Sequence, residues 1–183
     1  MKESLILTKK KSADTGIGVV CFITNPDRTR FLIQRKDGSY PYTKQHRTVC
    51  LFGGHVEASE TPLAAILREL EEEVCYQPIL DLAKANLAYS ILKLSLPSQN
   101  NPGTNFVLCA YELTVPEEVF SGLEKVLYSP GIICEGYGEI VTRDYLKFLV
   151  DFHPDDFFST LSKAFDIYLS IDHKIYEVLS HTP

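Results

Sequence analysis

Tryptophan is absent from this sequence, methionine occurs once, and no apolar run approaches the roughly 18 residues that span a bilayer. Paired cysteines are missing as well. The cysteine count is odd and no CxxC motif occurs among Cys21, Cys50, Cys75, Cys109 and Cys134. Wide, unpaired spacing argues against a zinc site or a disulfide framework. We therefore expect buried thiols in a reducing, cytoplasmic compartment.

Basic clusters are equally scarce. The one run of basic residues is Lys9–Lys11, and the formal net charge is -6. A nucleic-acid-binding protein needs a basic patch, so we expect no stable nucleic-acid partner. The first residues also lack the long apolar core and small-residue cleavage site of a signal peptide, and we expect no membrane association. An acidic chain repels polyphosphates unless metal ions reverse the local charge.

The length of 183 residues and the 45% hydrophobic content suit a single globular domain, residues 1–183. Its C-terminal part, about 154–181, is aromatic-rich and has helical periodicity. We expect this segment to pack on the core, with pairing to a second subunit as a homodimer the alternative.

Apolar runs and turn residues predict a mixture of strands and helices. Extended segments are expected at 16–24, 30–37, 48–54, 86–95, 105–114 and 131–142, and helices at 62–74, 116–128, 143–150 and 154–180. The first two strands and the fourth and fifth are expected to form hairpins. The fold class is therefore α/β or α+β, a sandwich built on a mixed sheet.

The helix at 62–74 carries an unusual crowd of glutamates. Thr61 is placed to cap it and Pro62 to occupy its first position. Residues three and four apart share a helix face, so Glu69, Glu72 and Glu73 are neighbours. A solvated acidic surface is one explanation for such a cluster. The other is a site for Mg²⁺, which prefers carboxylate oxygens and is often shared with substrate phosphates.

The wider spacing favours the metal site. The segment resembles the signature of the Nudix hydrolases, G-x5-E-x7-R-E-[apolar]-x-E-E-x-G-[apolar]. The matching positions are Gly54, Glu60, Arg68, Glu69, Leu70, Glu72 and Glu73. Two positions depart from the common pattern: Cys75 stands at the final glycine, and Ser59 stands where many members have glycine before the glutamate. The first departure affects the exit from the helix rather than the carboxylates.

This resemblance implies a Nudix-type αβα sandwich and hydrolysis of a nucleoside diphosphate derivative with Mg²⁺ or Mn²⁺ as cofactor. It implies that a water molecule attacks a phosphorus atom of the substrate and that this substrate is a small nucleotide. The metal ligands that it implies are Glu69, Glu72, Glu73 and the carbonyl of Gly53, with Glu57 and Glu60 as outer or additional ligands. Arg68 is expected to hold the loop before the helix through a salt bridge to Glu60.

The general base and the substrate contacts rest on weaker patterns. The base is a motif glutamate such as Glu69 or a glutamate of the loop at 134–141, where we favour Glu135 over Glu139. Arg35, Lys36 and Tyr40 are the expected substrate-binding residues, because cations hold phosphates and aromatic rings stack on bases.

Two other functions remain open at this stage. One is a Nudix-fold nucleotide-binding regulator without turnover, and the other is an isoprenoid diphosphate isomerase. The isomerase requires a catalytic cysteine in the pocket, and Cys50 precedes the motif closely enough to be considered.

Overall fold

The computed structural model describes residues 16–38, 40, 46–97 and 103–171. Its strands are β1 (Ile17–Thr24), β2 (Arg30–Arg35), β3 (Val49–Cys50), β4 (Phe52–His55), β5 (Leu92–Pro97), β6 (Asn105–Thr114) and β7 (Tyr137–Thr142). Its helices are α1 (Pro62–Glu73), α2 (Gln77–Asn86), α3 (Glu117–Val126), α4 (Arg143–Phe152) and α5 (Leu161–Ser170), with a 3-10 turn, η2, at Pro154–Asp156. Predictions for the N-terminal residues and for residues 172–181 lie outside this part.

The strands form one mixed sheet, which confirms the α+β fold class. Its order is β3-β2-β1-β6-β5, with β4 pairing β1 and β7 pairing β2. β1 and β6 are parallel, whereas the other named pairs are antiparallel. The two predicted hairpins, β1–β2 and β5–β6, are both present.

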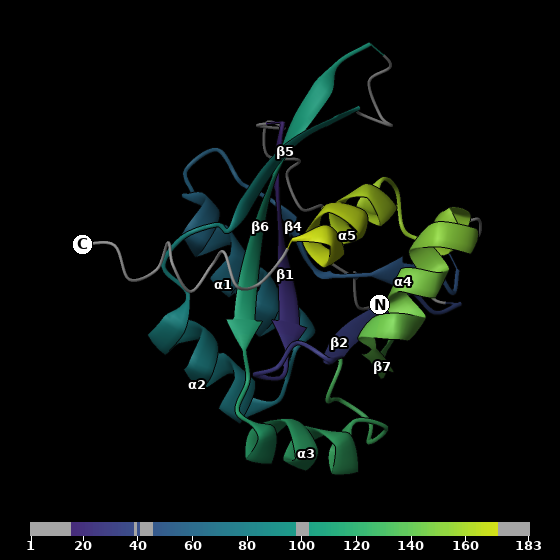
Figure 1. The fold of residues 1–183 in the computed structure, drawn as a ribbon. Coiled ribbons are helices and arrows are strands. Elements are labelled where there is room, and N and C mark those ends of the chain that lie inside the picture. Colours follow the sequence, from purple (N-terminus) through teal and green to yellow (C-terminus); the bar gives the residue numbers. More distant parts are fainter. Residues whose placement is uncertain (1–15, 39, 41–45, 98–102, 172–183) are drawn as a thin grey trace, which may run out of the picture.

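Helices cover the sheet on both sides, as Figure 1 shows with α1 and α2 on one side and α4 and α5 on the other. β1 separates two cores because its side chains alternate between the faces. Val19, Cys21 and Ile23 pack with α1, α2 and α3. Val20 and Phe22 pack with α4 and α5. Because β1 is buried on both faces, its sequence is a continuous apolar run instead of an alternation of apolar and polar residues.

The structure differs from the prediction in one missed helix and in several boundaries, among them the start of β7 at Tyr137 instead of residue 131. The sequence reading missed α2, which begins at Gln77–Pro78 and buries Ile79 and Ala83, and the strand expected at 86–95 begins only at Leu92. The helix expected from residue 154 is interrupted at 157–160. There the amide of Phe158 donates to the carbonyl of Val49 at 2.8 Å, so the chain pairs with β3 instead of forming helical hydrogen bonds.

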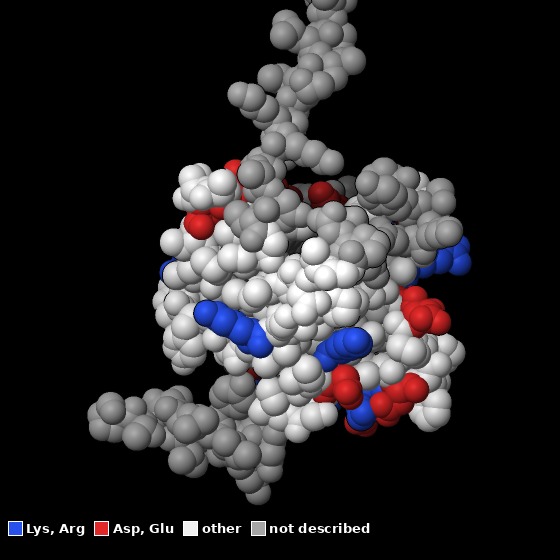
Figure 2. Space-filling view, turned by 90° about the horizontal axis from the view of Figure 1, so that it is seen from above, with Lys and Arg blue, Asp and Glu red and all other residues white. Residues whose placement is uncertain are grey.

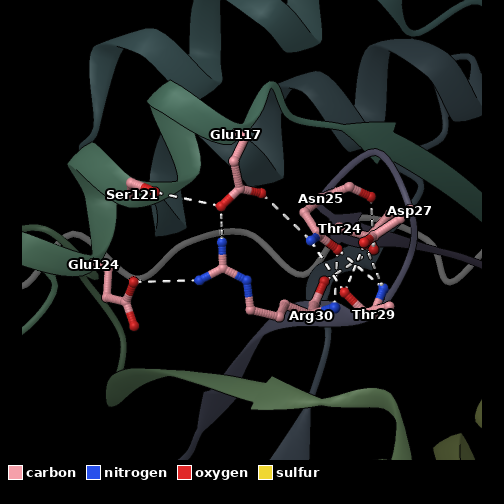
Figure 3. Close-up of polar contacts among 8 residues, drawn as sticks. All are labelled: Thr24, Asn25, Asp27, Thr29, Arg30, Glu117, Ser121 and Glu124. Atoms are coloured by element: carbon pink, nitrogen blue, oxygen red, sulfur yellow. Dashed lines mark hydrogen bonds and ion pairs between the residues drawn. The ribbon is translucent and has the colours of Figure 1, made fainter.

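A polar network joins the β1–β2 turn to α3 (Figure 3). Asn25 Oδ1 accepts hydrogen bonds from the amides of Thr29 and Arg30 at 3.0 and 2.9 Å, which fixes the turn. The guanidinium of Arg30 bridges Glu117 and Glu124, both on α3. These contacts hold α3 against the end of β2 that is remote from the glycine pair of β4.

Charged side chains do not merge into a basic surface on the face seen in Figure 2, where uncharged described residues dominate and the blue side chains stand apart. Over the described residues, no helix has both the length and the apolar character needed to cross a bilayer.

Candidate active site

Helix α1 places the glutamates, and its start agrees with the sequence prediction. The hydroxyl of Thr61 accepts a hydrogen bond from the amide of Ala64 at 3.1 Å, and Pro62 is the first helical residue. Ala65, Ile66 and Leu70 are buried against the sheet. Glu73 is buried beside them at the C-terminal end, whereas Glu72 is exposed. The acidic cluster is therefore not uniformly solvated.

Arg68 holds the loop that leads into α1. Its Nε lies 2.7 Å from Glu60 Oε1, and its Nη2 donates to the carbonyl of His55 at 3.1 Å. The expected ion pair between Arg68 and Glu60 is thus formed, and hydrogen bonding from Arg68 lowers the pKa of Glu60. The same guanidinium lies 2.7 Å from Glu69 Oε1 and 3.4 Å from Glu72 Oε1. A planar cation with several donors fixes these carboxylates relative to the loop.

The glycine pair of β4 brings the backbone against the acidic side chains. Gly53 lies opposite Val20 and Gly54 opposite Val19 in the β1–β4 ladder. Gly53 has φ of 145°, and a side chain there would collide with the carbonyl oxygen of Val19. A side chain on Gly54 would overlap the carboxylate of Glu69. Only glycine permits both approaches.

Among the described residues, Glu73 is the most deeply buried carboxylate. It is 3% exposed and accepts a hydrogen bond from the amide of Gly53 at 2.7 Å. Lys36 Nζ lies 3.6 Å from Glu73 Oε1 and 3.0 Å from Glu135 Oε2. Burial raises the pKa of Glu73 to about 7 even though Lys36 and the Gly53 amide favour the charged form. This group therefore changes its charge close to neutral pH.

Two further pKa values are shifted at this site. Burial raises the pKa of Glu69, although Arg68 opposes the shift. For Lys36, burial lowers the pKa, but the neighbouring Cys50, Glu73 and Glu135 outweigh it and the net shift is upward. Lys36 therefore stays charged and supplies the cation that the buried Glu73 needs.

A cavity of about 690 Å³ opens beside these groups. Eight of the residues singled out from the sequence line it: Gly53, Gly54, Glu69, Glu73, Glu135, Lys36, Tyr40 and Cys50. Within the described part of the chain, Glu57, Glu72, Arg68 and Arg35 do not line it. The cavity has the size of a small-molecule site.

Arg35 and Glu139 form a pair of their own. Arg35 Nε lies 2.5 Å from Glu139 Oε2, and its Nη1 donates to the carbonyl of Arg47 at 3.2 Å. This pair spans neighbouring strands, because Arg35 faces Tyr137 in the β2–β7 ladder. Of the two glutamates considered for the late loop, Glu135 is therefore the one that lines the cavity.

Sequence reasoning missed the wall that follows η2. Phe158, Ser159, Thr160 and Leu161 all line the cavity. The rings of Phe158 and Tyr40 meet edge to face with centroids 5.8 Å apart, and Lys36 Nζ lies 5.2 Å from the Tyr40 ring centre. The sequence signal was the aromatic pair at 157–158, which was attributed to a helix core.

The donor chemistry of the site suits a hard divalent cation, because carboxylates and a glycine backbone are gathered at one cavity wall. As placed, no three Asp, Glu, His or Cys side chains of the described residues already form a metal-binding cluster. The carboxylates are directed to Arg68 and Lys36 instead. A metal ion would have to compete with these two organic cations.

The cysteine prediction is wrong for two residues. Cys75 and Cys134 form a disulfide across a sequence separation of 59. Both are exposed, whereas Cys21, Cys50 and Cys109 are buried thiols as expected. The pairing arises because Val74 and Ile133 form a β-bridge, which brings two segments distant in the sequence side by side. An argument from spacing alone cannot detect such a contact.

Comparisons with known proteins agree with this architecture. A family model described as the NUDIX domain matches residues 14–125. A search of curated proteins finds no match. Among solved structures, a mutT/nudix family protein from Listeria innocua is 16% identical with a TM-score of 0.56, covering 93% of this chain and 99% of its own.

Two further structures are similar. The dihydroneopterin triphosphate pyrophosphohydrolase of E. coli is 16% identical with a TM-score of 0.52, covering 87% of this chain and 98% of its own. The MutT protein of Methanosarcina mazei Go1 is 14% identical with a TM-score of 0.50, covering 85% of this chain and 95% of its own. At such identities these likenesses establish the fold and nothing finer.

Proposed function

Because the chain belongs to the Nudix family of hydrolases that act on pyrophosphate bonds, we propose that it cleaves a nucleoside diphosphate derivative with the help of Mg²⁺ or Mn²⁺. The observation that carries this proposal is Glu73, a carboxylate 3% exposed at the wall of a cavity, with a pKa raised to about 7. A buried charge of this kind is tolerated when it serves a cation or a reaction.

The residues proposed to hold the metal are Glu69, Glu72, Glu73 and the carbonyl of Gly53, with Glu57 as an outer ligand. A bound divalent ion would supply charge neutralisation on the phosphates and a more acidic water. Arg68 keeps Glu69 and Glu72 in place from the side of the loop. Lys36 offers a fixed positive charge beside Glu73, suited to a phosphate oxygen as well as to the carboxylates.

In the proposed reaction a water oxygen attacks phosphorus, the bridging P–O bond breaks, and a carboxylate takes the proton of the water. Two cavity-lining carboxylates are placed for this role. Glu135 is the candidate favoured by its loop position, and it is held by Lys36 at 3.0 Å. Glu69 is the alternative, because it lines the cavity and burial raises its pKa. The pH–rate profiles of Glu135→Gln and Glu69→Gln at saturating metal distinguish them, since removal of the base lowers kcat and leaves only the part of the acidic limb that comes from Glu73.

The substrate is proposed to place its diphosphate beside Lys36 and its base or equivalent ring near Tyr40. An aromatic wall of Tyr40 and Phe158 supports this orientation. Arg35 was expected to bind substrate from its sequence position, but its guanidinium is engaged by Glu139. Arg35 does not line the cavity, and we propose that it supports the pairing of β2 with β7.

The decisive experiment is a product screen with Mg²⁺ over nucleoside triphosphates, nucleotide sugars, dinucleotides and a pterin triphosphate. Glu72→Gln should abolish release of phosphate or nucleotide without unfolding the chain. Glu71→Gln is the matched control, because Glu71 lies on the same helix but pairs with the exposed Lys84 at 2.7 Å. Equal activity of wild type and Glu72→Gln would refute the assignment of the metal ligands.

A separate assay with an isoprenoid diphosphate addresses isomerisation, the alternative that requires Cys50. Cys50 does line the cavity, but burial raises the pKa of its thiol to about 12. A thiol of this kind is a poor nucleophile or base at neutral pH. Double-bond migration without phosphate release, lost in Cys50→Ser, would favour the isomerase.

A further inference from the structure

The loop that carries Glu135 is attached to the end of α1 by three contacts. The amide of Cys75 donates to the carbonyl of Ile132 at 2.9 Å, and the amide of Cys134 donates to the carbonyl of Glu73 at 2.9 Å. The disulfide between Cys75 and Cys134 closes the same contact covalently. Glu73 and Glu135 therefore each lie within two residues of one half of the disulfide.

The other side of the loop is fixed as well. Gly136 has φ of 73°, and a side chain there would collide with the carbonyl oxygen of Arg35. Lys36, which follows Arg35 in the chain, lies with its Nζ 3.0 Å from the Glu135 carboxylate and 3.6 Å from the Glu73 carboxylate. Glu135 is thus held between a disulfide on its N-terminal side and a close backbone contact on its C-terminal side.

We propose that the Cys75–Cys134 disulfide is a redox-responsive link that positions Glu135 against Lys36 and the end of α1. The proposal rests on the hydrolase function proposed above and adds a control on the same site. With the link closed, the Glu135 carboxylate keeps its place at the cavity wall. With the link open, two backbone hydrogen bonds, the Lys36 ion pair and the packing of Ile133 in the core beside Val74 still hold the loop to α1, but the covalent restraint next to Glu135 is gone.

Exposure makes this link chemically distinct from the other sulfur groups of the chain. Cys75 and Cys134 are both exposed at the surface, so small thiols and disulfides reach them. Cys21, Cys50 and Cys109 are buried, and burial raises the pKa of each thiol. Thiolates react and thiols do not, so the three buried groups are poor partners for exchange.

The redox chemistry is ordinary thiol–disulfide exchange. A dithiol reductant breaks the Cys75–Cys134 bond, delivers two electrons and two protons to the sulfur pair, and is itself oxidised to a disulfide. In the reverse direction a low-molecular-weight disulfide accepts the two electrons: one cysteine thiolate displaces its first thiol, and the second cysteine displaces the protein-bound half. The thiol–disulfide redox potential of the surroundings then determines whether the link is closed and Glu135 is held in position.

The first test compares purified protein treated with a low-molecular-weight disulfide with protein treated with a dithiol. The closed form should show two fewer titratable thiols per chain than the reduced form. Reduction should lower kcat by about tenfold, with a smaller change in KM, because a misplaced proton acceptor affects turnover more than binding. Re-oxidation should restore the rate.

Variants at the two cysteines and at Glu135 separate an effect on the position of Glu135 from a general loss of activity. The double variant Cys75→Ser/Cys134→Ser should resemble the reduced enzyme and no longer respond to redox treatment. In Glu135→Gln, the rates of the oxidised and reduced forms should become equal, because the group that the link positions is gone. Cys109→Ser is the control and should respond like the wild type.

Hydrogen exchange gives a readout that does not depend on turnover. Reduction should accelerate amide exchange in residues 129–136 while leaving α1 protected. If the thiol count and exchange change but no substrate is cleaved, the proposed hydrolase function fails while the link stands. Equal thiol counts after both treatments, or unchanged exchange and an unchanged rate in an active enzyme, would overturn the proposal.

Discussion

Arg30 begins β2 and Lys36 follows its last residue. Each of the two contacts two glutamates, yet their surroundings differ. Arg30 bridges Glu117 and Glu124 on α3, whose side chains are 54% and 55% exposed (Figure 3). Lys36 is buried with Glu73, whose side chain is 5% exposed, and it also contacts Glu135, whose side chain is 57% exposed. The Arg30 cluster is a solvent-exposed link between β2 and α3, whereas Lys36 and Glu73 form a buried ion pair at the wall of the cavity. Similar residue types therefore serve a structural purpose at one end and suit a chemical one at the other.

The difference has an energetic side. Ion pairs in water contribute little, because solvent screens them and long side chains lose freedom. A buried carboxylate loses its hydration, and its partner offsets that loss only in part. The rise in the pKa of Glu73 to about 7 is the mark of this penalty. The chain carries a destabilising group where a divalent cation is proposed to bind.

The largest expected effect is on turnover. Glu73→Gln should lower kcat/KM by about 10³-fold, because a carboxylate proposed to hold the metal is replaced by a neutral amide of the same shape. Glu117→Gln, in the exposed cluster, should change it less than twofold. Steady-state rates on the best substrate of the screen check both. Comparable losses in the two variants would erase the distinction between the clusters.

Removal of the cations should separate the clusters by stability. Lys36→Met leaves Glu73 buried without its partner and should lower the free energy of unfolding by about 2–4 kcal/mol at pH 8. Arg30→Met should lower it by about 1 kcal/mol or less. Urea unfolding at fixed pH in the presence of a chelator measures both changes. A larger loss for Arg30→Met would contradict the burial argument.

The same features show how far the sequence could lead. The cap at Thr61 and the position of Pro62 are local patterns, so the start of α1 was predictable. The Arg68–Glu60 pair was expected from the resemblance to the Nudix signature. The wall at Phe158 and the Cys75–Cys134 link depend on contacts between distant segments. Spacing carries no information about such contacts. The helix α2, which buries Ile79 and Ala83, was also missed.

The pH dependence of stability should follow Glu73 in metal-free buffer. Its pKa is raised from 4.5 to about 7 in the folded protein, so between these values the folded state binds more protons than the unfolded state. Stability should therefore fall as pH rises from about 5 to about 7 and then level off, by about 1–3 kcal/mol. Glu73→Gln should remove this fall when urea midpoints are measured across the range. A fall of the same size in that variant would assign it to another group.

The cap of α1 should have a smaller effect. Thr61→Ala removes the hydroxyl that accepts from the amide of Ala64 and should lower stability by about 1 kcal/mol. Thr61→Ser keeps the hydroxyl and is the control. Thermal melts of the three proteins give the ranking, and equal midpoints for alanine and serine would show that the cap is not formed.

The smallest effect is expected in the exposed cluster. Glu124 lies 3.3 Å from Arg30 and its side chain is 55% exposed, so Glu124→Gln should change stability by less than about 0.5 kcal/mol. The small difference should shrink further in high salt. A salt-insensitive loss above 1 kcal/mol would mean that this pair is less screened than its exposure implies.

The most direct test is calorimetric titration of the metal-free protein with Mn²⁺ near pH 6.5, in two buffers of different ionisation enthalpy. Wild type should bind Mn²⁺ and release protons, because Glu73 is partly protonated at this pH and must ionise to act as a ligand. Glu73→Gln should bind far more weakly and without that proton release. Identical affinity and identical proton release in the two proteins would contradict the assignment of Glu73 to a metal site.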